Sequence, residues 1–164
     1  MKKLLVYIFI CFSLIGCNFL KNTKEKKFKL NKSNSDLVGA WEFVGRLDKD
    51  GNKIDTIWYG KVWEVASGPL ITFYQNGTYS KKFTPKNTDT GKWVYNSKKE
   101  LLILFLYIDS TDWIGKDLIK RNMAVKHKDN EYYEELEYKI LRLTPDTLQY
   151  LDYSGRNMIY KKIK

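Results

Sequence analysis

The stretch Leu70-Ile71-Thr72-Phe73-Tyr74-Gln75-Asn76-Gly77-Thr78-Tyr79-Ser80-Lys81-Lys82-Phe83-Thr84 decides the fold of this chain. Apolar and polar side chains alternate along both halves of the stretch, and Asn76-Gly77 lies between them. Alternation with a period of two is typical of a β-strand with one buried face, and an Asn-Gly pair favours a tight turn. The stretch is therefore predicted to form a β-hairpin.

The register of this hairpin depends on the length of its turn. A two-residue turn would pair Tyr74 with Tyr79, whereas a three-residue turn that includes Gln75 would pair Phe73 with Tyr79. We prefer the three-residue turn, because it places Gly77 where a left-handed residue is required. The inner face then consists of Ile71, Phe73, Tyr79 and Phe83. Lys81 also faces inward, and we expect its side chain to reach out of an open end.

The rest of residues 37–164 repeats this alternation. Strands are expected within residues 37–47, 54–65, 91–95, 101–108, 118–127, 131–143, 148–152 and 156–162. Turns are expected at Asp50-Gly51, Thr144-Pro145-Asp146-Thr147 and Ser154-Gly155. The fold class is therefore all-β, with eight to ten short antiparallel strands joined in chain order. Closure into an up-and-down barrel would remove the unpaired edges of such a meander.

Some strands carry more specific predictions about their faces. Trp41 and Arg46 fall on opposite faces of the first strand, so Arg46 is expected outside. Residues 101–108 are apolar on both faces, so one face belongs to the core and the other needs a cover. In residues 118–127, Ile119, Met123 and Val125 are expected inside. A change of parity near Arg142 predicts a β-bulge.

The predicted interior is rich in aromatic rings. The inward side chains that we consider as ligand-binding residues are Trp41, Phe73, Tyr79, Trp93, Tyr95 and Phe105. An eight-stranded barrel is just wide enough to be filled by side chains or to hold one small ligand. Two interpretations stay open, a filled core and a ring-lined cavity for an apolar or ring-bearing molecule.

Residues 1–16 have the composition of a secretion signal. Met1-Lys2-Lys3 is positively charged, and the apolar run that follows is shorter than the roughly 20 residues of a spanning helix. Leu14-Ile15-Gly16-Cys17 resembles the lipobox of bacterial lipoproteins. That resemblance implies that a diacylglycerol is attached to Cys17 and that the chain is cut before it. The alternative is an ordinary secreted protein in which a cysteine happens to follow Gly16.

Residues 17–36 are polar and rich in lysine, which predicts a flexible tether between the lipid and the domain. The whole chain has a formal net charge of +10. Eight of the 29 basic and two of the 19 acidic residues precede residue 37, so residues 37–164 carry 21 basic and 17 acidic residues, a net charge of +4. The tether lysines either attract an anionic bilayer or simply keep the linker solvated. Nucleic acid is not an expected partner, because the charge is concentrated beside the anchor.

Several motifs in order resemble the lipocalin-like domain of small bacterial lipoproteins of the Bacteroidetes. They are Leu37-Val38-Gly39-Ala40-Trp41, Ile71-Thr72-Phe73 with Asn76-Gly77-Thr78-Tyr79, Gly91-Lys92-Trp93, Tyr138-Lys139-Ile140, and Leu143-Thr144-Pro145-Asp146-Thr147-Leu148. The resemblance implies an eight-stranded barrel in which Trp41 plugs the closed end. It also implies a basic residue stacked on Trp41, for which Arg156 and Arg142 compete. Thr111-Asp112-Trp113 is faintly similar to a later lipocalin motif.

The sequence offers little support for catalysis. His127 is the sole histidine, and no Gly-x-Ser-x-Gly elbow is present to supply a nucleophile. Once Cys11 is removed with the signal, Cys17 is the one cysteine and its sulfur is predicted to carry lipid, so a transition-metal site lacks ligands. We therefore expect no enzyme, no cofactor and no metal.

Two functions remain. One is a lipid-anchored binder of a small hydrophobic ligand. The other is an interaction module of the envelope, such as an inhibitor or assembly factor, with a filled barrel and a docking strip on the second face of residues 101–108. The tether lacks an acidic run, and Asn18 rather than aspartate follows Cys17. The expected location is the cell envelope, on the periplasmic face of the outer membrane.

Overall fold

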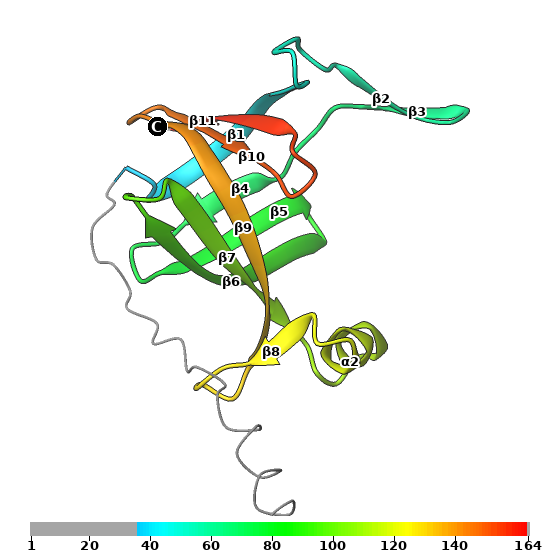
Figure 1. The fold of residues 1–164 in the computed structure, drawn as a ribbon, viewed down its shortest axis with the longest axis vertical. Coiled ribbons are helices and arrows are strands. Elements are labelled where there is room, and N and C mark those ends of the chain that lie inside the picture. Colours follow the sequence, from blue (N-terminus) through cyan, green and yellow to red (C-terminus); the bar gives the residue numbers. More distant parts are fainter. Residues whose placement is uncertain (1–35, 164) are drawn as a thin grey trace, which may run out of the picture.

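The computed structural model describes residues 36–163, and strands dominate them (Figure 1). The strands are β1 (Gly39–Leu47), β2 (Thr56–Tyr59), β3 (Val62–Val65), β4 (Leu70–Phe73), β5 (Thr78–Thr84), β6 (Asn87–Asn96), β7 (Leu101–Ile108), β8 (Ala124–Lys126), β9 (Tyr132–Leu143), β10 (Thr147–Leu151) and β11 (Asn157–Lys162). The helix α2 (Trp113–Lys120) lies between β7 and β8. The predictions for Cys17, for the signal and for most of the tether fall outside the described residues.

Eight of these strands form a closed barrel. Strands β1, β4, β5, β6, β7, β9, β10 and β11 each pair antiparallel with the next, and β11 pairs with β1 to complete the ring. The predicted fold class, an antiparallel up-and-down barrel, is confirmed. Strands β2 and β3 form a separate two-stranded sheet, and β8 extends the barrel sheet beside β9. The ring of eight strands and the hydrophobic core described below both lie within residues 36–163.

The hairpin of β4 and β5 has the three-residue turn that the sequence favours. Phe73 pairs with Tyr79 and Ile71 pairs with Lys81. The amide of Gly77 donates to the carbonyl of Tyr74 at 3.0 Å, and Gly77 has a φ of 83°. The placement of Phe83 inside is wrong, because the register shifts between Lys82 and Thr84 and the Phe83 side chain is 50% exposed.

A bulge in β1 reverses the expected faces of its second half. The register with β11 shifts between Phe43 and Gly45, so that Val44 is exposed and Arg46 turns inward and is buried. The expectation that Arg46 faces outward is therefore wrong. One extra residue moves every later side chain to the other face, and Arg46 now lies opposite Met158 in the core.

The predicted bulge in β9 is present beside Arg142. Gln149 pairs with Arg142 and Tyr150 pairs with Ile140, which leaves Leu141 as the extra, exposed residue. The bulge lies near the end of a long strand that changes partners along one edge, first β8 and then β10. The following turn is also confirmed, because the amide of Thr144 donates to the carbonyl of Thr147 at 2.9 Å.

Residues 118–127 do not form the strand that was expected. Asp112 caps a helix there, and its carboxylate accepts from the amide of Gly115 at 2.6 Å. The helix α2 runs to Lys120, and only the short strand β8 follows. Met123 and Val125 are exposed rather than inside. The aspartate before a short apolar run is a helix start signal that period-two alternation concealed.

The barrel has two unlike ends. Three turns, at residues 74–77, 97–100 and 144–146, lie at the end where β1 begins, which we call the closed end. The connections 48–69, 85–86, 109–131 and 152–156 lie at the other, open end. In Figure 1 the β2–β3 hairpin projects at the upper right and α2 lies at the lower right, both on the side of the open end. No helix within residues 36–163 is long and apolar enough to cross a bilayer.

Candidate functional site

The closed end of the barrel is plugged by Trp41. Its indole nitrogen donates to the carbonyl of Leu37 at 2.8 Å, and both residues are fully buried. The ammonium of Lys162 lies 4.9 Å from the centre of the Trp41 ring. The stacked cation is therefore Lys162, and the assignment to Arg156 or Arg142 is wrong. Gly39 makes this stack fit, because a Cβ there would lie 2.8 Å from Cε of Lys162.

Several of the aromatic side chains that were predicted to face inward pack against one another in the barrel core. Phe73 packs edge-on against Trp93, with ring centres 5.4 Å apart, and Tyr79 lies beside Phe73. The Trp93 indole donates to the carbonyl of Tyr74 at 3.2 Å, while Tyr95 is half-buried against the same core. At most 1% of Trp41, Phe73 or Tyr79 is exposed, so these side chains are packed away from solvent. The closed half of the barrel is filled by side chains.

Phe105 does not belong to this interior. It pairs with Lys92, whose side chain lies on the outer wall, and its ring packs edge-on against His127 at 5.4 Å. The expectation that Phe105 faces inward is wrong, because Leu102 and Leu104 occupy the inner face of β7. The cover that the second face of β7 needs is thus partly supplied by the loop that carries His127. Tyr107 is the residue of that face which stays exposed.

The open half of the barrel contains two inward-facing cations. Arg46 donates from its terminal nitrogen to the carbonyl of Ser67 at 3.1 Å. Lys81 does not reach out of the open end as expected. Its ammonium donates to the hydroxyl of Tyr138 at 3.3 Å and lies 5.1 Å from the centre of that ring. Burial lowers the pKa of Lys81, and the negative charge of Asp89 on β6 partly offsets this.

Three buried tyrosines lie near these cations. The rings of Tyr150 and Tyr160 are stacked with centres 5.6 Å apart, and Tyr138 meets Tyr150 edge-on at 5.1 Å. The hydroxyl of Tyr150 donates to that of Tyr160 at 3.4 Å. Burial raises the pKa of Tyr160 to about 12 and also raises the pKa of Tyr138 and Tyr150, so all three are neutral at physiological pH.

Two polar atoms in this interior lack a hydrogen-bond partner among the described residues. They are the hydroxyl oxygen of Tyr79 and Nε of Arg46, and both are buried. Buried polar atoms of folded proteins are nearly always paired, so an unpaired one points to strain or to a partner that binds. Inward-facing Leu106 and Leu136 are only half-buried, unlike Leu102 and Leu104 on the same inner face.

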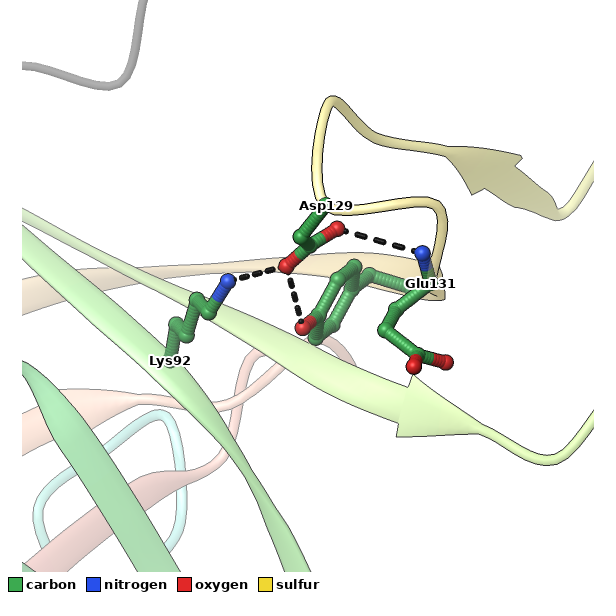
Figure 2. A network of polar contacts seen from close by, with 4 residues as sticks. Lys92, Asp129 and Glu131 are labelled. Atoms are coloured by element: carbon green, nitrogen blue, oxygen red, sulfur yellow. Dashed lines mark hydrogen bonds and ion pairs between the residues drawn. The ribbon is translucent and has the colours of Figure 1, made fainter.

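A concave region lies on the outer wall of the barrel. It is a shallow groove of about 360 Å³ lined by Tyr74, Thr78, Tyr79, Ser80, Thr90, Gly91, Lys92, Tyr107 and Tyr133. Figure 2 shows the polar network at its edge, where Asp129 accepts from Lys92, from the Tyr133 hydroxyl at 2.9 Å and from the Glu131 amide at 3.2 Å. The hydrogen bond from Lys92 is the main reason that the pKa of Asp129 falls to about 2.

The sequence did not predict that Arg46 faces inward or that the ammonium of Lys81 stays inside the barrel. For Arg46 the signal was Val44-Gly45, where a glycine within a strand indicates a bulge, and that signal was overlooked. For Lys81 the register placed it inside correctly, and the error was to assume that an ammonium must leave the barrel. The hydroxyl that accepts from it belongs to Tyr138, which lies 57 residues away in the sequence. No group of three or more His, Cys, Asp or Glu able to hold a metal occurs within the described residues.

Comparisons with known proteins are sparse. No family model matches the chain, and no curated protein does. Among solved structures, a lipocalin-like protein from Bacteroides uniformis is similar, with 17% identity and a TM-score of 0.47, over 78% of this chain and 99% of that one. An uncharacterized protein from Bacteroides eggerthii has 15% identity and a TM-score of 0.48, over 77% of this chain and 99% of that one.

Proposed function

We propose that this chain is a lipid-anchored, non-catalytic protein of the cell envelope that binds one small hydrophobic ligand in the open half of its barrel. The ligand has an apolar body and an acidic or strongly hydrogen-bond-accepting group. The observation that carries the proposal is the inward-facing pair Arg46 and Lys81, of which Lys81 contacts the ring and hydroxyl of Tyr138.

The two cations set the chemistry of the ligand head. Taking a charge out of water is costly unless hydrogen bonds or an opposite charge compensate it. Arg46 keeps one unpaired nitrogen, and Lys81 donates to a neutral phenol rather than to Asp89 opposite it on β6. A carboxylate, sulfonate or phosphate that entered the mouth would supply the missing acceptor and the missing negative charge.

The walls of the same half set the chemistry of the ligand body. Leu106 and Leu136 face inward and keep part of their surface accessible, and the rings of Tyr138 and Tyr150 continue this apolar lining. Pockets with mostly apolar walls and a few convergent polar groups are typical small-molecule sites. The filled closed half forms the floor beneath them, which limits the ligand to the open half.

Binding is tested by calorimetric titration of the mature chain with Cys17→Ser, which contains the whole barrel. The probes are laurate and dodecanol, which share a twelve-carbon tail and differ in the charge of the head. We expect laurate to bind at least about tenfold more tightly than dodecanol, because one charge-assisted hydrogen bond supplies that much free energy. Arg46→Met should bring laurate down to the affinity of dodecanol.

The matched control is Lys92→Met, which removes a lysine from the outer wall of the same barrel. This variant should bind laurate as the unchanged chain does. No heat with either probe, or equal affinities for laurate and dodecanol, would refute the proposed ligand class.

The anchor is supported by the sequence Leu14-Ile15-Gly16-Cys17 and by the polar tether that follows. Two or three acyl chains at about 0.8 kcal/mol per buried methylene hold a protein on a bilayer. Mass spectrometry of the protein from the membrane fraction should show an acylated Cys17 at the amino terminus, and Cys17→Ser should release the protein from that fraction. Outer-membrane location is checked by separating the two membranes.

A further inference from the structure

The groove on the outer wall of the barrel lies apart from the ligand site proposed inside it. Its lining comes from the turn before β5 and from four neighbouring strands, β5, β6, β7 and β9. The register places Ser80 on β5 opposite Thr90 on β6. It also places Tyr107 on β7 opposite Tyr133 on β9. We call this groove, with the lining named above, the outer groove.

Tyrosine rings stand on both sides of the outer groove. Tyr74 lies in the turn between β4 and β5 and Tyr107 lies on β7, so that β5 and β6 run between them. Their side chains are 45% and 43% exposed. The hydroxyl of Tyr74 lies 3.4 Å from Oγ of Ser80, and Tyr107 meets the buried Tyr133 edge-on with ring centres 6.2 Å apart. Both rings therefore have neighbours that hold them and still keep accessible surface.

The floor between these rings carries small side chains with hydroxyl groups. Thr78, Ser80 and Thr90 line it, and Gly91 adds only backbone atoms. A hydroxyl group donates one hydrogen bond and accepts others. The floor therefore suits a ligand whose polar groups also both donate and accept.

The charged residue of the lining is Lys92, and its charge is balanced by Asp129 (Figure 2). The hydrogen bond from Lys92 is the main reason that the pKa of Asp129 falls to about 2, so this carboxylate is ionised at physiological pH. A further acid, Glu131, lies near Tyr107, and its negative charge raises the pKa of that phenol. Within the described residues, the outer groove therefore offers no excess of positive charge that would select an anion.

We propose that the outer groove binds a neutral sugar ring. The C–H face of a pyranose matches an exposed tyrosine ring, and its hydroxyls match floor groups that both donate and accept. A purely apolar ligand would cover those floor hydroxyls without pairing them, which costs free energy. The groove volume of about 360 Å³ is near the lower end of small-molecule sites, so the ligand is a short saccharide.

The polar network at the edge of the outer groove is in place before a ligand binds. The Tyr133 hydroxyl donates to Asp129 at 2.9 Å, and the ammonium of Lys92 lies 5.1 Å from the centre of the Tyr133 ring. An ammonium has three donors, so Lys92 can bond a sugar hydroxyl as well as Asp129. Groups that are already held lose less freedom when the ligand arrives, which favours binding.

The test titrates the mature chain with Cys17→Ser with three neutral probes, the methyl pyranosides of glucose, galactose and mannose. Amide shifts are followed by NMR. We expect at least one probe to give saturable shift changes at Thr90, Gly91 and Lys92. Glucuronate, a pyranose that carries an anionic carboxylate, should bind no more tightly than methyl glucoside. Tyr107→Ala should weaken binding at least about tenfold, because it removes the ring that the sugar covers.

The matched control is Tyr153→Ala, which removes a tyrosine that is 85% exposed in the turn between β10 and β11. This variant should bind the sugar as the unchanged chain does. No shift change with any of the three pyranosides, or equal losses in Tyr107→Ala and Tyr153→Ala, would overturn the proposal. A concentration-dependent dimer that Tyr107→Ala abolishes would also overturn it, because the groove would then bind a second copy.

Asp129→Asn tests the selection of a neutral ligand. It leaves the charge of Lys92 uncompensated, so the ratio of glucuronate affinity to methyl glucoside affinity should rise about two- to fivefold. A merely structural role of Asp129 would weaken both probes alike and leave this ratio unchanged, which would refute the charge argument.

The outcome separates from that of the proposed function, because the two sites use different residues. Tyr107→Ala should keep the laurate affinity of the unchanged chain. Arg46→Met should lose laurate and keep the sugar-induced shifts at Thr90, Gly91 and Lys92.

Discussion

The closed half and the open half of the barrel are made by the same eight strands but contain different chemistry. In the closed half, Trp41, Phe73 and Leu148 are fully buried and Lys162 caps the plug from the end. In the open half, Arg46 and Lys81 face inward, the Lys81 ammonium donates to the Tyr138 hydroxyl, and Nε of Arg46 stays unpaired. Apolar packing in the closed half therefore stabilises the fold. The buried polar groups of the open half cost some stability, and a ligand can use them.

The largest expected effect comes from breaking the closed half. Trp41→Ala should lower the free energy of unfolding by about 3–5 kcal/mol, because it removes a fully buried ring together with its hydrogen bond. Urea unfolding measures this loss. Trp113→Ala, at a tryptophan that is 79% exposed, should change stability by less than about 0.5 kcal/mol. Similar losses for both variants would contradict a filled closed half.

A smaller effect is expected where the two halves meet, at Gly91. A Cβ at Gly91 would lie 1.9 Å from the carbonyl oxygen of Phe105 and 2.9 Å from the ring of Tyr79. Gly91→Ala must therefore separate β6 from β7 or displace Tyr79, at a cost of about 2–3 kcal/mol. Thr90→Ala, at the exposed neighbouring position, serves as the control in the same unfolding series. An unchanged Gly91→Ala variant would show that the wall is looser than described.

Removing single tyrosine hydroxyls should distinguish an unpaired buried hydroxyl from a paired one inside the barrel. Tyr79→Phe deletes a buried hydroxyl that has no partner and should stabilise the chain by up to about 1 kcal/mol. Tyr160→Phe deletes the hydroxyl that accepts from Tyr150 and should destabilise the folded chain by about 0.5–1 kcal/mol. Both changes remove the same atom from a buried ring. A loss of stability in Tyr79→Phe would mean that its hydroxyl is paired in solution.

The smallest effect concerns the outer wall, where solvent screens the charges. The pKa of Asp129 is lowered in the folded chain from 3.8 to about 2, so its ion pair contributes stability above pH 3.8 that is lost as the pH falls toward 2. Partial exposure limits this contribution to less than about 1 kcal/mol. The stability difference between the unchanged chain and Asp129→Asn should shrink as the pH falls through this window. A difference that does not vary with pH would exclude Asp129 as its source.

The sequence predicted the closed half far better than the open half, and the reason is physical. Period-two alternation and Gly77 determine the register of β4 and β5, and that register brings Phe73 and Tyr79 together. The placement of side chains in the open half depends on features that the apolar–polar alternation of the sequence does not reveal. An extra residue at Val44 turns Arg46 inward, and the partner of Lys81 is a hydroxyl on another strand. Asp112 starts a helix that a strand pattern concealed.

The division into a filled and an open half is tested most directly by backbone and side-chain NMR shifts of the mature Cys17→Ser chain titrated with laurate. The account predicts shift changes at Arg46, Lys81, Tyr138 and Tyr150, with Trp41, Phe73 and Leu148 unchanged. Shift changes centred on Trp41 and Phe73 would contradict a filled closed half. The absence of any shift change on addition of laurate would contradict a ligand site in this barrel.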